Sequence, residues 1–159
     1  MDKRIKLTLV LIITVILYIV FVHEPAHYIA CELVGGDASF GFLELNPAVN
    51  CVFNGASNLS MFFVFIAPYI VDLFILLLFL KVKRNRWTYF LPTIAFMNTA
   101  GCGLIAPLIQ VQIGNDFVNM ALVGLLPTGL VLVVVNVAIW AAFYRTDLTD
   151  KKRLSKILK

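Results

Sequence analysis

The sequence has few charged residues, and long parts of it have no positive charge at all. Of its 159 residues, 14% are charged and 61% are hydrophobic, and the mean hydropathy is +0.94. A soluble domain usually carries about 25% charged residues, and one of this length could not bury so much apolar surface. The composition therefore argues against a water-soluble enzyme, a nucleic-acid-binding protein and a disordered chain. It indicates a membrane protein.

The 13 Lys and Arg residues fall in three blocks, at residues 3–6, 81–86 and 145–159, so that residues 7–80 and 87–144 contain none. A membrane-crossing helix needs roughly 20 predominantly apolar residues. Each cation-free stretch is long enough for two such helices and a connection. We therefore predict an all-α integral membrane protein of about four transmembrane helices, near residues 7–33, 59–80, 88–109 and 119–143.

The positions of the cations also predict the orientation of these helices. The positive-inside rule puts both termini and the loop at residues 81–86 in the cytoplasm. Residues 34–58 lie between the first two spans; residues 38–45 partly alternate and turn-forming residues follow, which indicates a short hairpin-like segment on the outer face. An ordinary outer loop whose aromatic residues touch lipid headgroups is an equally good interpretation. Residues 1–144 then form one polytopic membrane domain, and residues 145–159 form a basic cytoplasmic tail. A cleaved signal peptide is the alternative for the first span.

Cysteine is scarce too, because the chain has only Cys31, Cys51 and Cys102. Their irregular spacing does not predict a disulfide framework. Cys31 and Cys51 could both reach the outer face and form a bridge, but buried and unreactive thiols are the favoured interpretation.

Both histidines of the chain lie in one short motif, His23-Glu24-Pro25-Ala26-His27. Residues four apart share one helix face, so the two imidazoles can bind one Zn²⁺. Glu24 lies beside them as a general base for water activated by the metal. The alternative is a chance motif of satisfied core histidines, but ionisable side chains in a membrane span indicate function by default. Pro25 predicts a kink that the motif tolerates.

Catalytic zinc sites usually have three protein ligands, so a third must come from elsewhere in the chain. The depth of the histidine pair puts it near the outer edge of the membrane, on the side of the segment that contains Asp116. Asp116 is therefore the predicted third ligand, and the N-cap of the fourth span is its alternative role. Other candidates are weaker because of their position on the helix or in the outer loop: Cys31, Glu32, Asp37 and Glu44.

One further acid, Asp72, lies inside the second predicted span. An acid at that position is costly and suggests a function. Pairing with Asn98 or with the cations that begin at Lys81 is an equally good interpretation.

The apolar span with its His-Glu-Pro-Ala-His motif, the pair Gly35-Gly36 and the hairpin-like segment resemble the site-2 protease family of intramembrane zinc metalloproteases. The stretch from Ala67 to Asp72 is loosely similar to that family's Gly-Pro-x-x-Asn sequence. The resemblance extends over about residues 7–120. It implies a three-helix core, zinc bound by His23, His27 and an Asp from the third core span, here Asp116, and Glu24 as general base.

The predicted function is thus a membrane-embedded zinc endopeptidase that cleaves membrane-associated proteins or peptides and has no nucleic-acid partner. A non-enzymatic helical bundle that binds haem or a transported metal through the same histidines is the alternative. A small transporter or assembly factor with Asp72 on its path is a third hypothesis.

Overall fold

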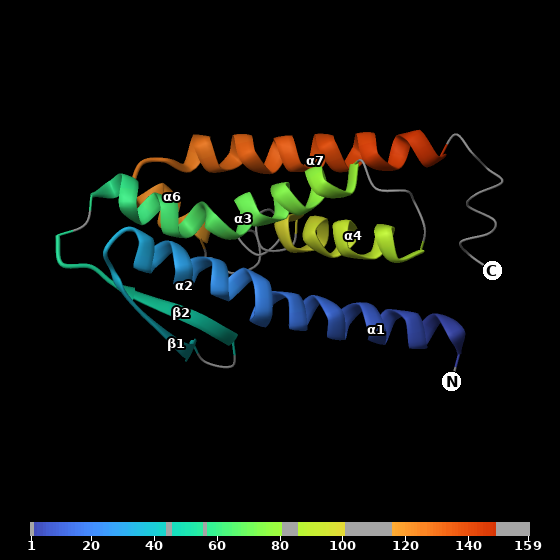
Figure 1. Cartoon of the computed structure of the whole chain (residues 1–159), viewed down its shortest axis with the longest axis horizontal. Helices are drawn as coiled ribbons and strands as arrows, with labels where there is room; N and C mark the ends of the chain where they lie inside the picture. Colours follow the sequence, from blue (N-terminus) through green and yellow to red (C-terminus); the bar gives the residue numbers. More distant parts are fainter. Residues whose placement is uncertain (1, 44–45, 56, 81–85, 101–115, 149–159) are drawn as a thin grey trace.

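The computed structural model describes residues 2–43, 46–55, 57–80, 86–100 and 116–148. These residues are mostly helical, with one two-stranded sheet (Figure 1). In chain order the elements are α1 (Lys3–Tyr18), η1 (Ile19–His23), α2 (Glu24–Leu33), β1 (Asp37–Leu43), β2 (Asn46–Val52), α3 (Asn58–Leu80), α4 (Arg86–Ala100), α6 (Asp116–Leu122) and α7 (Leu126–Leu148).

Two helical segments of the described part are long and apolar enough to cross a membrane, judged by length and composition. They are Thr8–Leu33, in the first predicted span, and Asn58–Phe79, in the second. For the third predicted span the structure describes α4, which ends at Ala100. The rest of that span lies outside the described residues.

The first span is continuous from α1 to α2 but contains one wide turn, the π-helical segment η1. Its backbone signature is the hydrogen bond from the Glu24 N–H to the carbonyl of Ile19, five residues back. Pro25 follows directly, has no N–H to donate, and crowds the carbonyl of the preceding turn. The predicted disturbance at Pro25 therefore takes the form of a π turn that ends at His23, a feature that often occurs at functional sites.

The fourth span differs from its prediction as a single helix over residues 119–143. The short helix α6 ends at Leu122, Gly124 has a positive φ of 76°, and α7 begins at Leu126. A positive φ costs glycine little, so the chain can turn sharply there and leave the helical path. Asp116 is consequently the first residue of a separate helix and is not the N-cap of the long one.

The predicted hairpin is present as an antiparallel pair of strands, with Asp37 opposite Val52 at its open end. A disulfide between Cys31 and Cys51 joins the end of α2 to β2. The preference for free thiols at these two positions was therefore wrong. Irregular cysteine spacing gave no sign that the hairpin folds back along α2 and brings the two sulfurs together.

Gly36 makes this close approach between α2 and the hairpin possible. A Cβ atom at this position would lie 2.7 Å from the sulfur of Cys31 and 2.9 Å from that of Cys51. Any side chain at residue 36 would therefore collide with the disulfide.

Helix α3 is the centre of the packing. On one side its Val64 and Ala67 pack with small residues of α2 and with Ala38 of β1. On another side, Ile66 and Tyr69 pack against α6 and α7. The helix that bears the histidine motif and the helix that bears Asp116 thus contact the same element.

We predict that the Cys31–Cys51 disulfide stabilises the fold substantially. The bridge closes a loop with a sequence separation of 20 residues, and a crosslink of that length typically contributes about 2–4 kcal/mol. The C31S/C51S double variant should therefore unfold at a lower temperature than the wild type in the same detergent. A reducing agent should lower the midpoint of the wild type and leave that of the double variant unchanged. Equal midpoints for the two oxidised proteins would contradict the prediction.

Candidate metal centre

The two histidines of the motif face one another across one helical turn, as their spacing predicts. The Nε2 atoms of His23 and His27 are 3.3 Å apart, and the two rings meet edge to face. Both residues are buried, with 5% and 7% of their surface exposed. Two imidazole nitrogens are therefore presented at one shielded point at the junction of η1 and α2.

Asp116, the first residue of α6, lies beside the two histidines although it is distant from them in the sequence. Its Oδ2 lies 3.5 Å from Nε2 of His23, and its Oδ1 lies 3.3 Å from Nε2 of His27. One ligand atom from each of the three residues lies within 4.8 Å of the others. Within the described residues, this is the group of His, Cys, Asp and Glu side chains that could hold a metal ion. The prediction of Asp116 as the partner of the histidine pair agrees with this geometry.

These distances fit a tetrahedral zinc ion. With zinc–ligand bonds of about 2.0–2.1 Å, two ligands of a tetrahedral ion lie about 3.3 Å apart. The separation of the two Nε2 atoms is 3.3 Å, and the two oxygens of Asp116 approach one nitrogen each, Oδ2 at 3.5 Å from His23 and Oδ1 at 3.3 Å from His27. Two imidazoles and one carboxylate form a donor set known from catalytic zinc sites, where the fourth position is taken by water or substrate.

A backbone carbonyl orients His27. The Nδ1 atom of His27 lies 2.7 Å from the carbonyl oxygen of Val64 in α3. Because a carbonyl oxygen only accepts, Nδ1 of His27 carries a hydrogen, and Nε2 is the ring atom turned toward Asp116 and His23. Metal-binding histidines usually donate their second nitrogen in this way.

Pro68 explains why this carbonyl is available. In a regular helix the carbonyl of Val64 would accept the N–H of residue 68, but that residue is proline and has none. Pro68 is also fully buried, so water cannot replace the missing donor easily. The imidazole of His27 donates to this carbonyl instead. A proline in α3 thereby orients the ring of a histidine in α2.

Tyr69 holds Asp116, the predicted third ligand, and was not identified from the sequence. Its hydroxyl donates to Oδ2 of Asp116 at 3.0 Å, and its ring packs edge to face on His23. The residue is completely buried. Its position within the stretch from Ala67 to Asp72 was the only sequence signal, and that signal did not indicate a contact with Asp116.

The electrostatics of Asp116 favour its charged form. Burial by itself would raise the pKa of this carboxyl group, but the nearby imidazoles, above all that of His27, hold the pKa well below its usual range. Asp116 is therefore a carboxylate near neutral pH, which is the form that binds metal ions.

Glu24 is buried beside the ligands, with 9% of its surface exposed. Its carboxyl group interacts electrostatically with both imidazoles and with Asp116, and it is hydrogen-bonded by the backbone of Val49 in β2. The general base predicted from the motif thus lies next to the proposed ligands. The hairpin reaches this part of the site through β2.

The weaker candidates for the third ligand have other partners or lie elsewhere. Cys31 is in the disulfide, and the carboxylate of Glu32 accepts the backbone N–H of Ala38. Asp37 is exposed at the start of β1, and Glu44 lies outside the described residues.

Asp72 is fully buried in α3 and is bound by side chains of two other helices. It accepts hydrogen bonds from Tyr18, Asn98 and Thr99. The expected pairing with Asn98 is confirmed, whereas Lys81 lies outside the described residues.

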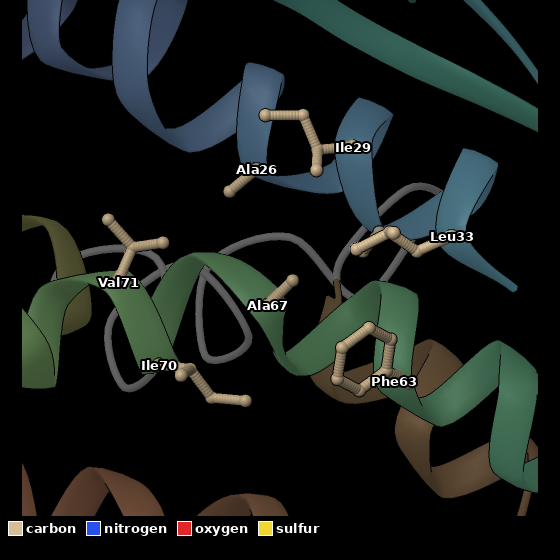
Figure 2. A pocket seen from close by; sticks show the side chains of 8 residues that line it. Ala26, Ile29, Leu33, Phe63, Ala67, Ile70 and Val71 are labelled. Atoms are coloured by element: carbon tan, nitrogen blue, oxygen red, sulfur yellow. The ribbon is translucent and has the colours of Figure 1, made fainter.

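A shallow apolar cavity of about 200 Å³ lies between α2 and α3 (Figure 2). Ala26, Ile29 and Leu33 line it from one helix, and Phe63, Ala67 and Ile70 line it from the other. Because Ala26 precedes His27 directly, this groove runs beside the helix turn that bears the site.

Comparisons with protein-family models, with curated proteins and with solved structures found no match for this chain. The function of the protein is therefore inferred from the residues and geometry of the site.

We predict that the purified wild-type protein binds about one Zn²⁺ per chain and that D116A and H27A lose it. Each substitution removes one of three ligands, and two ligands alone hold zinc weakly. D37A is the matched control, because Asp37 is an exposed acid at the start of β1. Elemental analysis after dialysis against trace zinc measures the stoichiometry. Full zinc occupancy in D116A would disprove the assignment of Asp116.

We also predict that P68A weakens zinc binding by roughly tenfold, the lower end of what loss of a supporting hydrogen bond usually costs. Alanine restores an N–H that competes with His27 for the carbonyl of Val64. P92A is the control, because Pro92 is likewise a buried proline inside a helix, α4. Competition with a chelator measures the affinities. Equal affinities of P68A and P92A would rule out this role of Pro68.

Proposed function

We propose that this protein is a membrane-embedded zinc endopeptidase of the site-2 protease type. The observation that supports this most strongly is the convergence of His23, His27 and Asp116, with Glu24 buried beside them. Three ligands and a neighbouring carboxylate are the parts that metal-assisted hydrolysis of a peptide bond needs.

The residues divide the chemistry among them. Zinc, when bound, supplies Lewis-acid activation of water and of the peptide carbonyl. Glu24 accepts a proton from the attacking water, whose oxygen forms the new bond to the carbonyl carbon. The C–N bond then breaks, and Glu24 returns the proton to the leaving nitrogen. His23, His27 and Asp116 hold the metal throughout.

The arrangement of the helix ends supports a four-span topology with cytoplasmic termini. The start of α1, the start of α4 and the end of α7 lie at the same end of the molecule (Figure 1). Each of the three cationic blocks adjoins one of these helix ends in the sequence, as the positive-inside rule requires. The disulfide joins α2 to the hairpin, and disulfides form in oxidising compartments. We therefore propose that the hairpin and the adjoining site face away from the cytoplasm.

The surroundings of the site suggest an extended apolar substrate. A strand such as β1 can pair with a segment of substrate through its backbone, which unwinds a helix and exposes its peptide bonds. The groove between α2 and α3 has small side chains at its base, Ala26 and Ala67, and offers room for an apolar side chain or helix next to His27. We propose that a membrane segment of another protein lies along this groove.

The geometry does not favour the haem-binding alternative. Two axial imidazoles must approach a haem iron from opposite faces. Here the Nε2 atoms of His23 and His27 point to one place and are 3.3 Å apart. A single small ion fits between them far better than a porphyrin.

We predict that E24Q retains zinc and loses peptidase activity by at least about a hundredfold, because a general base contributes typically 10²–10⁴-fold to the rate. E32Q is the control, a neighbouring acid on α2 that is bonded to the hairpin backbone. The protein is reconstituted in liposomes with a mixture of single-span membrane peptides. Mass spectrometry then detects new N-termini. A wild type that binds zinc and cleaves none of them, or an E24Q variant as active as the wild type, would count against the peptidase.

A further inference from the structure

The second nitrogen of His23 contacts a side chain from another helix. Its Nδ1 atom lies 3.0 Å from Nδ2 of Asn98 in α4, and both residues are buried. In this orientation the amide nitrogen of Asn98 donates to Nδ1 of His23. A histidine that binds metal through Nε2 carries its hydrogen on Nδ1, so metal binding by His23 would require the amide to turn its oxygen toward Nδ1 and accept that hydrogen. His27 is held by the backbone of α3, and His23 is held by a side chain of α4.

Asn98 is in turn held by Asp72. The amide nitrogen of Asn98 donates to Oδ2 of Asp72 at 2.8 Å. The hydroxyl of Thr99 donates to the same oxygen at 2.6 Å, and the hydroxyl of Tyr18 donates to Oδ1, also at 2.6 Å. Asp72 has no exposed surface. This carboxyl group is thus fixed by three donors from α1 and α4.

Burying these polar groups costs free energy unless each of them is hydrogen-bonded. Their presence therefore indicates a role beyond packing. An isolated carboxylate inside a membrane bundle is expensive, and leucine could fill the same space without any penalty. What distinguishes Asp72 from a space-filling residue is its connection, through one amide, to a proposed metal ligand.

We propose that Asp72 and Asn98 are positioning residues for the metal centre and fix the ring of His23 through its Nδ1 atom. This inference depends on the proposed metal site. Partners behind a ligating histidine set the orientation of its ring, and loss of such a partner typically lowers metal affinity about 10- to 100-fold. The pair lies outside the His-Glu-Pro-Ala-His motif and makes no contact with the metal position.

The test uses Co²⁺, whose visible absorption depends on its coordination geometry. Removing the contact in N98L should lower Co²⁺ affinity about tenfold and alter the absorption bands. L76A is the control. Leu76 is fully buried in α3 and has no polar group, so this variant disturbs packing without removing a side-chain hydrogen bond. It should keep both the affinity and the spectrum of the wild type.

Exchanging the side chains of Asp72 and Asn98 distinguishes a role in positioning His23 from a role in packing alone. N98D alone sets two carboxylates against each other and should weaken Co²⁺ binding. The double variant D72N/N98D keeps one carboxylate and one amide but presents the carboxylate directly to His23. Its affinity should return to within about threefold of the wild type, because two residues in one network are coupled.

The outcomes distinguish this inference from the proposed function. A wild type that binds neither Co²⁺ nor Zn²⁺ would overturn the metal site and the inference together. A wild type that binds Co²⁺, with N98L unchanged in affinity and spectrum, would overturn the inference alone. If N98L does not fold, the D72N/N98D variant tests the inference in its place. A folded D72N/N98D protein that binds Co²⁺ as weakly as N98D would also overturn the positioning role.

Discussion

Polar side chains inside an apolar helix bundle must find their partners within the protein, and this constraint shapes the whole centre of the molecule. Water is not available there to replace a missing hydrogen bond. His27 bonds a carbonyl of α3, His23 contacts Asn98, and Asp116 accepts the hydroxyl of Tyr69. Each of these contacts joins two helices, so the site and the helix packing are one arrangement. A change in either should disturb the other.

The prolines of the two long apolar segments contribute to this arrangement. Pro25 follows the π turn that ends at His23, and Pro68 leaves the carbonyl of Val64 free for His27. In a soluble helix the freed groups would usually meet water. In an apolar bundle they have to meet another protein group, and here one of them meets an imidazole. The missing N–H that weakens the helix thus provides a fixed acceptor at the candidate metal centre.

The sequence allowed good prediction of the elements with strong periodic or compositional signals. The first two spans, the hairpin and the shared face of His23 and His27 appear where they were expected, because each depends on local spacing alone. The break at Gly124 was not predicted, and the Cys31–Cys51 bridge was only the less favoured alternative. A single glycine in an apolar run is compatible with a continuous helix, and a bridge depends on how two elements fold against each other.

The sequence by itself determined which groups can carry chemistry here, since two histidines and a glutamate share one turn of an otherwise apolar segment. Only the tertiary structure decided what stands opposite them. The approach of Asp116, the role of Tyr69 and the chain from Asp72 through Asn98 to His23 all join residues more than 20 positions apart. Helix periodicity fixes neighbours within a few residues. Contacts across the bundle depend on side-chain packing, which no local pattern encodes.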